Sequence, residues 1–284
     1  MQIYTKFLSD DPRVTLTCYI QEPSKEMMAV AKKPAMLILP GGAYFFTSDR
    51  EAEPIALAYA SKGFQTFVLR YSVGKRAHGC KPLREASQAI GMIREHADEW
   101  FVEKDKVYTV GFSAGGHLSG WVGLCGEHKP NGAILGYPAV ELFSDERKEE
   151  RSRIIGALLG ANFTDEEAEQ LNLVNHIKED SIPMFIWSTA EDVLTTPAPI
   201  YQFAYAYARA NRPLELHMYQ FGEHGYSLAN HVTANGRKSL VDPLVEEWVD
   251  KSIEWIHRNF GRPEIVDKPH QTIEGIIDPG DMDY

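Results

Sequence analysis

The sequence predicts an α/β fold in which a mostly parallel central sheet carries helices on both faces. Strand-like apolar runs and helix-like amphipathic runs alternate along most of the chain, as in folds built from strand–helix–strand units. The run at residues 35–39 is apolar throughout, which indicates a strand buried on both faces. Another apolar run leads straight into a glycine-rich turn at residues 111–115, and a helical pattern follows it.

The first half of the chain is predicted to start with a hairpin. Two alternating runs, residues 2–8 and 14–20, flank Ser9-Asp10-Asp11-Pro12, which is turn chemistry and indicates an antiparallel pair at a sheet edge. The strands and helices expected next are strand 35–39, helix 53–61, strand 64–69, helix 83–100, strand 106–110 and a helix from His117 onward.

The second half continues the alternation with one interruption. We expect strands at residues 132–135, 183–189 and 214–219, a helix at 200–209 and a closing helix at 240–260. Between the first two of these strands, residues 141–180 hold two charged, helix-like pieces at 149–159 and 165–171. Their charges fit a solvated helix face, and a lid over a binding site is the alternative that stays open.

The domain organisation expected from these elements is simple. Residues 1–260 are predicted to form one domain, with residues 141–180 as a small helical insertion or lid. Residues 261–284 combine prolines with acidic residues, which is typical of an extended C-terminal arm.

Composition and charge limit the classes of function. Hydrophobic residues make up 44% of the 284, enough for a sizeable core, and a net charge of −11 leaves no broad basic face for nucleic acid. Neither a cationic start with an apolar run nor eighteen successive apolar residues occur, so we expect a cytoplasmic protein without a membrane partner. The three cysteines are far apart, which fits reduced thiols better than disulfides or a zinc site. The oligomeric state is left open, a homodimer included.

The turn at residues 111–115 reads Gly-Phe-Ser-Ala-Gly, a GxSxG sequence between a strand and a helix. A serine on so tight a turn is forced into a strained backbone conformation, which the flanking glycines tolerate because they have no side chain to collide. The Ser113 hydroxyl is thereby pushed out of the sheet. The amide N–H of Ala114 and the positive end of the next helix then lie where an oxyanion would form.

A serine nucleophile needs a base, and the base needs a carboxylate that holds it in one tautomer. Glu191 and Asp192 follow the strand predicted to end at residue 189, and we favour Asp192 as the acid. His224 follows the strand predicted to end at residue 219, between glycines that suit a sharply bent loop. Both loops leave the carboxyl edge of the sheet, where open α/β sheets bind ligands, so His224 is the predicted base.

Other histidines are weaker candidates for the base. Of the ten in the chain, His217 falls inside a predicted strand and His231 lies further on. A metal cluster that uses His224 and His231 is not expected, because no compact ligand set such as HExxH is present. No metal and no organic cofactor are therefore expected.

The stretch Pro40-Gly41-Gly42-Ala43-Tyr44 follows an early strand and is the expected second half of the oxyanion-binding site. Its glycines let backbone N–H groups face a substrate. Tyr44 and Phe45, together with Phe46, are candidate substrate-binding residues that would line an acyl or sugar subsite, and a place in the core is the alternative.

Four stretches together, PGGAYFFTSDREAEPIA, GFSAGGHL, STAEDVL and FGEHGYSL, resemble the α/β-hydrolase superfamily. Within it they are similar to the small esterases of the acetylxylan and feruloyl esterase kind, also called lipases or sugar esterases. The motifs cover residues 40–228, most of the chain, and their joint order is specific for the superfamily but much less for the substrate.

This resemblance implies an α/β-hydrolase fold and a role for each matching residue. Ser113 would be the nucleophile, Asp192 and His224 would complete a catalytic triad, and the oxyanion donors would be the amides of Gly42, Ala43 and Ala114. Many related esterases have an HGGG sequence where this chain has Pro40 and, at the third glycine, Ala43. An amide at Ala43 can still donate.

The expected function is that of a serine carboxylesterase that hydrolyses short acyl esters, with acetylated sugars or xylan fragments as one class of substrate, through an acyl-enzyme intermediate. A serine peptidase that resembles prolyl oligopeptidase is one alternative, although no second domain is available to select peptides. A hydrolase fold that only binds a ligand or protein is the other. Such proteins usually lose a triad member, and here all three are present.

Overall fold

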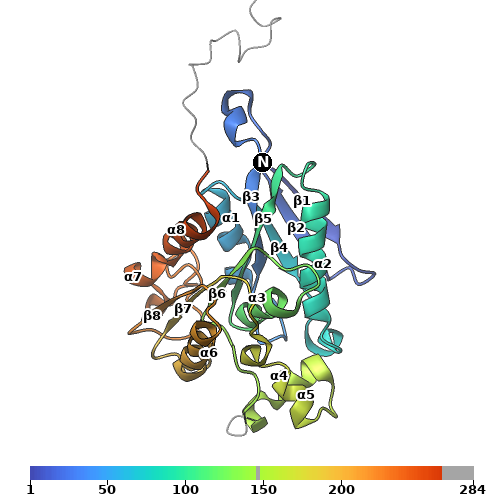
Figure 1. Ribbon diagram of the computed structural model, residues 1–284, viewed down its shortest axis with the longest axis vertical. Coiled ribbons are helices and arrows are strands. Elements are labelled where there is room, and N and C mark those ends of the chain that lie inside the picture. Colours follow the sequence, from blue (N-terminus) through green and yellow to red (C-terminus); the bar gives the residue numbers. More distant parts are fainter. Residues whose placement is uncertain (145–147, 264–284) are drawn as a thin grey trace, which may run out of the picture.

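The computed structural model describes residues 1–144 and 148–263, and its centre is one eight-stranded sheet (Figure 1). The strand order is β1-β2-β4-β3-β5-β6-β7-β8. Strand β2 runs antiparallel to both β1 and β4, and every pair from β4 to β8 is parallel. The strands are β1 (Gln2–Phe7), β2 (Thr15–Ile20), β3 (Lys33–Leu39), β4 (Gln65–Arg70), β5 (Val102–Phe112), β6 (Gly132–Gly136), β7 (Met184–Thr189) and β8 (Leu214–Tyr219). The predicted edge hairpin and the mostly parallel α/β sheet are both confirmed.

Helices cover both faces of this sheet, as the alternation predicts. One hydrophobic cluster unites α1 and α8 with the sheet through residues such as Ile55 and Trp248. A second cluster holds α2, α3 and α6 against the other face through Ile90, Leu118 and Phe203. The helices are α1 (Glu53–Ala60), α2 (Lys81–Glu95), α3 (Ala114–Cys125), α4 (Lys148–Leu159), α5 (Asp165–Glu169), α6 (Pro197–Arg209), α7 (Pro243–Glu246) and α8 (Trp248–Phe260).

Two of the predicted helices differ most from their expected bounds in the structure. Helix α2 ends at Glu95 rather than at residue 100, although Trp100 is still buried in the core. The single closing helix expected over residues 240–260 is wrong, because the structure has α7 from Pro243 and a separate α8 from Trp248. The late start has a local cause: Pro243 has no amide hydrogen for a helix interior, and the Asp242 side chain accepts from the amides of Leu244 and Val245 and so caps a helix that begins at Pro243.

The insertion at residues 141–180 is tied to the body of the protein. The Asn172 side chain accepts from the amides of Leu142 and Phe143, at 2.8 and 2.9 Å, and donates to the Phe143 carbonyl at 2.8 Å. The amide of Leu173 donates to the carbonyl of Val140 at 3.0 Å. Asn172 is buried, so these bonds hold the two ends of the insertion together, with α4 and α5 at the lower end of the molecule (Figure 1).

Three expectations about the chain remain predictions. The extended arm expected over residues 261–284 lies, from residue 264 onward, outside the described residues, and the single domain over residues 1–260 is likewise an expectation. No helix in the described ranges is long and apolar enough to cross a membrane. Location in the cytoplasm also stays a prediction.

Candidate active site

Ser113 lies on a sharp turn between β5 and α3. Its backbone angles are φ 53° and ψ −117°, in a region that side chains rarely adopt. A Cβ on Gly111 would lie 2.0 Å from the Gly115 carbonyl oxygen, and one on Gly115 would lie 2.0 Å from the Leu39 carbonyl oxygen. Both glycines are therefore required by packing. Helix α3 starts at Ala114, so the turn is tighter than the expected start at His117 implies.

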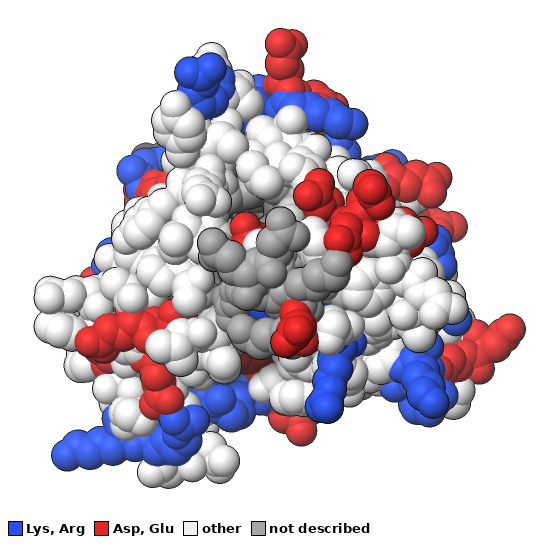
Figure 2. Space-filling model, turned by 90° about the horizontal axis from the view of Figure 1, so that it is seen from below, with Lys and Arg blue, Asp and Glu red and all other residues white. Residues whose placement is uncertain are grey.

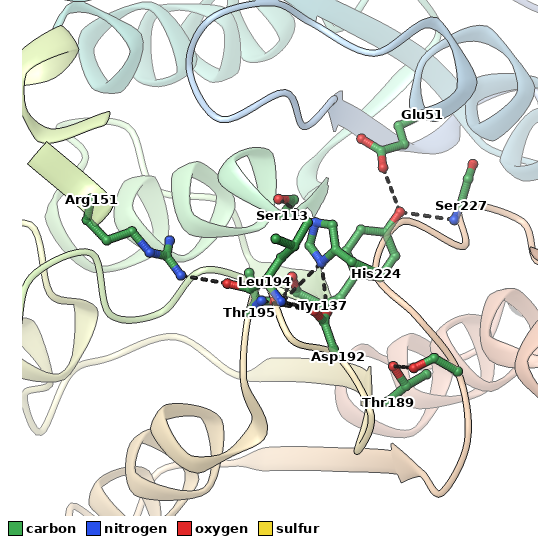
Figure 3. A network of polar contacts seen from close by, with 11 residues as sticks. Glu51, Ser113, Tyr137, Arg151, Thr189, Asp192, Leu194, Thr195, His224 and Ser227 are labelled. Atoms are coloured by element: carbon green, nitrogen blue, oxygen red, sulfur yellow. Dashed lines mark hydrogen bonds and ion pairs between the residues drawn. The ribbon is translucent and has the colours of Figure 1, made fainter. Parts of the chain in front are cut away.

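The structure brings Ser113, His224 and Asp192 into one hydrogen-bonded chain (Figure 3). His224 Nε2 lies 2.9 Å from the Ser113 hydroxyl oxygen, and His224 Nδ1 lies 2.7 Å from Asp192 Oδ2. Because a carboxylate can only accept, the Nδ1 atom carries the proton and Nε2 is left to accept from the serine hydroxyl. The three side chains come from the ends of β5, β7 and β8.

Asp192 is held by four donors. Its Oδ1 atom accepts from the amides of Leu194 and Thr195 at 2.8 and 2.9 Å, and Oδ2 accepts from the Thr195 hydroxyl at 2.7 Å besides His224. Burial opposes ionisation of Asp192, but the bonds from His224 and Thr195 outweigh it and its pKa is lowered. The neighbouring Glu191 is exposed and accepts from the Gly222 amide at 3.0 Å instead.

The loop after β3 lies beside the serine in an unusual backbone conformation. Gly42, Ala43 and Tyr44 have φ values of 132°, 51° and 60°. A Cβ on Gly42 would lie 2.2 Å from the Phe46 carbonyl oxygen, so this position requires glycine. No described residue accepts a hydrogen bond from the amide N–H of Gly42, Ala43 or Ala114, and all three residues line the pocket that contains Ser113. The predicted oxyanion donors are thus gathered around one space.

That pocket has a volume of about 350 Å³. Its walls include apolar side chains of Ala139, Leu142, Ile154 and Leu194, and charged or polar ones of Arg50, Glu51 and Arg151 stand among them. Arg151 and Ile154 belong to α4, so the insertion forms part of the wall, and Arg151 donates to the Leu194 carbonyl at 2.7 Å (Figure 3).

Tyr44 and Phe45, the candidate substrate-binding residues, do not line this pocket. Tyr44 is fully buried in the core, and its hydroxyl lies 2.7 Å from His117 Nδ1. The left-handed turn at Ala43 and Tyr44 carries that ring inward, and Phe45 is half exposed outside the pocket. Phe46 is the aromatic residue of this run that reaches the wall.

His117 is a buried residue that the sequence does not single out. Its Nε2 atom lies 2.7 Å from the Leu171 carbonyl oxygen, which can only accept, so Nε2 carries the proton and Nδ1 accepts from the Tyr44 hydroxyl. Burial lowers the pKa of His117 to about 4. This one neutral ring therefore joins α3, the loop after β3 and the insertion.

The described residues provide neither a metal-binding cluster nor a basic surface on the face shown in Figure 2. Within residues 1–144 and 148–263 no group of three His, Cys, Asp or Glu side chains is arranged to hold a metal ion. On the face seen in Figure 2, lysines and arginines are scattered among acidic side chains, and the described residues form no continuous basic area there.

The sheet order, the strained serine turn and the Ser–His–Asp arrangement place the chain in the α/β-hydrolase superfamily. The protein belongs to the BD-FAE family, whose model matches residues 20–202. The resemblance seen in the sequence motifs is thereby confirmed.

Three known proteins show how far the similarity extends. MGS-M1, an alpha/beta hydrolase enzyme from a Medee basin deep-sea metagenome library, is 36% identical with a TM-score of 0.77, over 91% of this chain and 97% of that one. Endo-1,4-beta-xylanase B of Butyrivibrio fibrisolvens is 30% identical over 70% of this chain, and the acetylxylan esterase of Xylanibacter ruminicola is 28% identical over 78%. The chain spans only 33% and 46% of the length of these two curated relatives.

Proposed function

We propose that this protein is a serine carboxylesterase that hydrolyses short acyl esters, with acetylated sugars and xylan fragments as one class of substrate. The observation that carries the proposal is the unbroken chain from the Ser113 hydroxyl through His224 to Asp192, at bond lengths of 2.9 and 2.7 Å. Ser113 lines a pocket together with Gly42, Ala43 and Ala114. The backbone amides of these three residues have no hydrogen-bond acceptor among the described residues.

In the first half of the proposed reaction, Ser113 Oγ attacks the ester carbonyl carbon while His224 Nε2 takes the hydroxyl proton. The carbonyl oxygen becomes an oxyanion, and the amides of Gly42, Ala43 and Ala114 are the groups that would donate to it. Collapse breaks the bond to the alcohol, which leaves with the proton from His224. Asp192 stabilises the imidazolium that exists between these two proton transfers.

In the second half, water replaces the alcohol. His224 takes a proton from the water molecule, whose oxygen attacks the acyl carbon, and the returning proton restores the Ser113 hydroxyl as the acid leaves. No step requires a redox partner or a further group.

The size of the pocket supports short acyl groups. Its volume of about 350 Å³ has to hold both the acyl part and the portion of the alcohol next to the ester, and Ala139, Leu142 and Ile154 form an apolar wall for the former. Similarity to an acetylxylan esterase supports a sugar as the alcohol.

The proposal is tested by replacing Ser113 with alanine. With p-nitrophenyl acetate, longer homologues and acetylated xylo-oligosaccharides, Ser113→Ala is expected to lower kcat by a factor of about 10⁴ or more, because a triad acts as a unit. Ser61→Ala, at an exposed serine just after α1, is the control and should leave turnover unchanged.

Two further measurements separate the proposal from its alternatives. A fluorophosphonate should label the wild type and not Ser113→Ala, because labelling needs an activated serine. Nearly full ester turnover in Ser113→Ala would contradict the proposal. Faster turnover of aminoacyl-naphthylamides than of any ester would favour a peptidase instead.

A further inference from the structure

Glu51 is a buried carboxylate at the active site that the proposed reaction does not use. It is 5% exposed, follows the loop that holds Gly42 and Ala43, and lines the pocket. Its Oε2 atom accepts from the amide of Gly41 at 2.7 Å, and its Oε1 atom accepts from the hydroxyl of Tyr137 at 2.6 Å (Figure 3). Both oxygens of the carboxylate are therefore occupied by donors.

The direction of these hydrogen bonds follows from their partners. The amide of Ser227 donates to the Tyr137 hydroxyl oxygen at 3.0 Å, and an amide can only donate, so the phenolic proton points to Glu51. Burial raises the pKa of Glu51, and the hydrogen bonds from Tyr137 and Gly41 and the nearby Arg50 offset this rise only in part. In this arrangement both oxygens of Glu51 accept, one from the Gly41 amide and one from the Tyr137 hydroxyl.

These hydrogen bonds, from Glu51 through Tyr137 to Ser227, extend to the loop that carries His224. Ser227 lies three residues after His224, and its hydroxyl donates to the Arg50 carbonyl at 2.6 Å. The Tyr137 ring stands edge-on to the His224 imidazole, with centroids 5.0 Å apart and planes at 70°. The Arg50 guanidinium donates to the carbonyl of Gly225 at 2.7 Å, which adds a second tie to the same loop.

We propose that Glu51 is a positioning residue that couples the oxyanion loop to the His224 loop, with Tyr137 as the intermediate. The inference rests on the proposed function of Ser113. Through Gly41, Glu51 fixes the peptide just before the predicted donors Gly42 and Ala43. Glu51 also fixes the hydroxyl of Tyr137. The Tyr137 ring then orients the His224 imidazole, and its hydroxyl oxygen holds the amide of Ser227.

Glutamine at this position cannot satisfy both donors. A carboxamide has one acceptor oxygen, so its NH₂ group would face either the Gly41 N–H, which it repels, or the Tyr137 hydroxyl, to which it can only donate. Glu51→Gln therefore keeps the volume of the side chain but leaves either the Gly41 amide or the phenolic proton of Tyr137 without its acceptor. Because oxyanion donors act mainly in the transition state, the loss should appear in kcat rather than in KM.

The test compares kcat and KM per titrated active site, with a fluorophosphonate used to count sites. Glu51→Gln should lower kcat by about 10- to 100-fold, less than the about 10²- to 10³-fold expected for a whole oxyanion donor, with KM within about threefold. Tyr137→Phe should lower kcat in the same way. Because both variants break one chain, the double variant should cost clearly less than the product of the two single effects.

Glu85→Gln is the matched control. Glu85 is also a buried glutamate that accepts from a backbone amide and a hydroxyl, those of Ser72, at 2.7 and 2.6 Å, and it does not line the pocket. It should lower Tm while kcat per site stays unchanged.

The outcomes separate this inference from the proposed function. If Glu51→Gln and Tyr137→Phe lower Tm but keep kcat per site within about twofold of the wild type, while Ser113→Ala abolishes turnover, the role of Glu51 is only structural and the inference is overturned. Should Glu51→Gln not fold, Tyr137→Phe alone decides in the same way. Turnover that survives Ser113→Ala would instead reject the proposed function itself.

Discussion

At the scale of single residues, Asp192 and Glu191 are adjacent acids after β7 that have different partners. Asp192 accepts from His224 Nδ1 at 2.7 Å, whereas Glu191 accepts from the backbone amide of Gly222, in the loop that carries His224. Asp192→Asn should lower kcat by about 10⁴-fold, because an amide no longer holds the imidazole in the tautomer that accepts the serine proton. The measurement is kcat with p-nitrophenyl acetate.

Glu191→Gln is the control for that substitution. It removes one carboxylate at the neighbouring position, and kcat is expected to stay within about threefold, because Glu191 touches neither His224 nor the pocket. If the two variants lost activity equally, Asp192 would not be the acid.

At the scale of elements, Asn172 decides how firmly the insertion is held. Its side chain makes three hydrogen bonds to Leu142 and Phe143, and it is buried. Asn172→Ala should lower the free energy of unfolding by about 2–4 kcal/mol, because buried backbone donors are then left unsatisfied. Urea unfolding measures this loss.

Asn175 provides the comparison within the same segment. It is exposed, and its side chain donates one hydrogen bond, to the Glu169 carbonyl at 2.8 Å. Asn175→Ala should cost about 0.5–1 kcal/mol at most. Equal losses from Asn172→Ala and Asn175→Ala would show that the ends of the insertion are not held by Asn172.

At the scale of the whole molecule, His117 links stability to pH. Its pKa of about 4 in the folded protein lies below the ordinary 6.5, so between these values the unfolded chain binds a proton that the folded one does not. The contribution of His117 is therefore complete above pH 6.5 and is lost as the pH falls toward about 4. On going from about pH 7 to about pH 4.5, it should remove on the order of 2–3 kcal/mol from the free energy of unfolding.

His117→Gln isolates this contribution, because glutamine does not titrate. Urea unfolding at several pH values should show a smaller loss for His117→Gln than for the wild type on acidification, even though the variant is less stable at neutral pH. His231→Gln, at an exposed histidine, should follow the wild type. Identical pH dependence in His117→Gln and the wild type would contradict the assignment.

Most of the strands, helices and turns could be predicted from local patterns in the sequence. Strands β3 and β4 and the second half of β5 lie where short apolar runs predict them, since a buried strand needs apolar residues on both faces. The start of α7 was also readable in principle, because Pro243 and the capping Asp242 are local signals against a continuous helix. The serine turn was recognisable for the same reason, since its glycines are needed within five residues of one another.

What the sequence by itself determined is the order of strands and helices, the turn at Ser113, and the acid and histidine that follow β7 and β8. What only the tertiary structure decided is which way the side chains beside that turn point: Tyr44 lies in the core against His117, and Glu51 reaches Tyr137. Partners 73 and 86 residues apart are brought together by packing of the whole sheet. The physical reason is that backbone conformation depends mainly on neighbours along the chain, whereas a buried polar group takes whichever partner the fold places beside it.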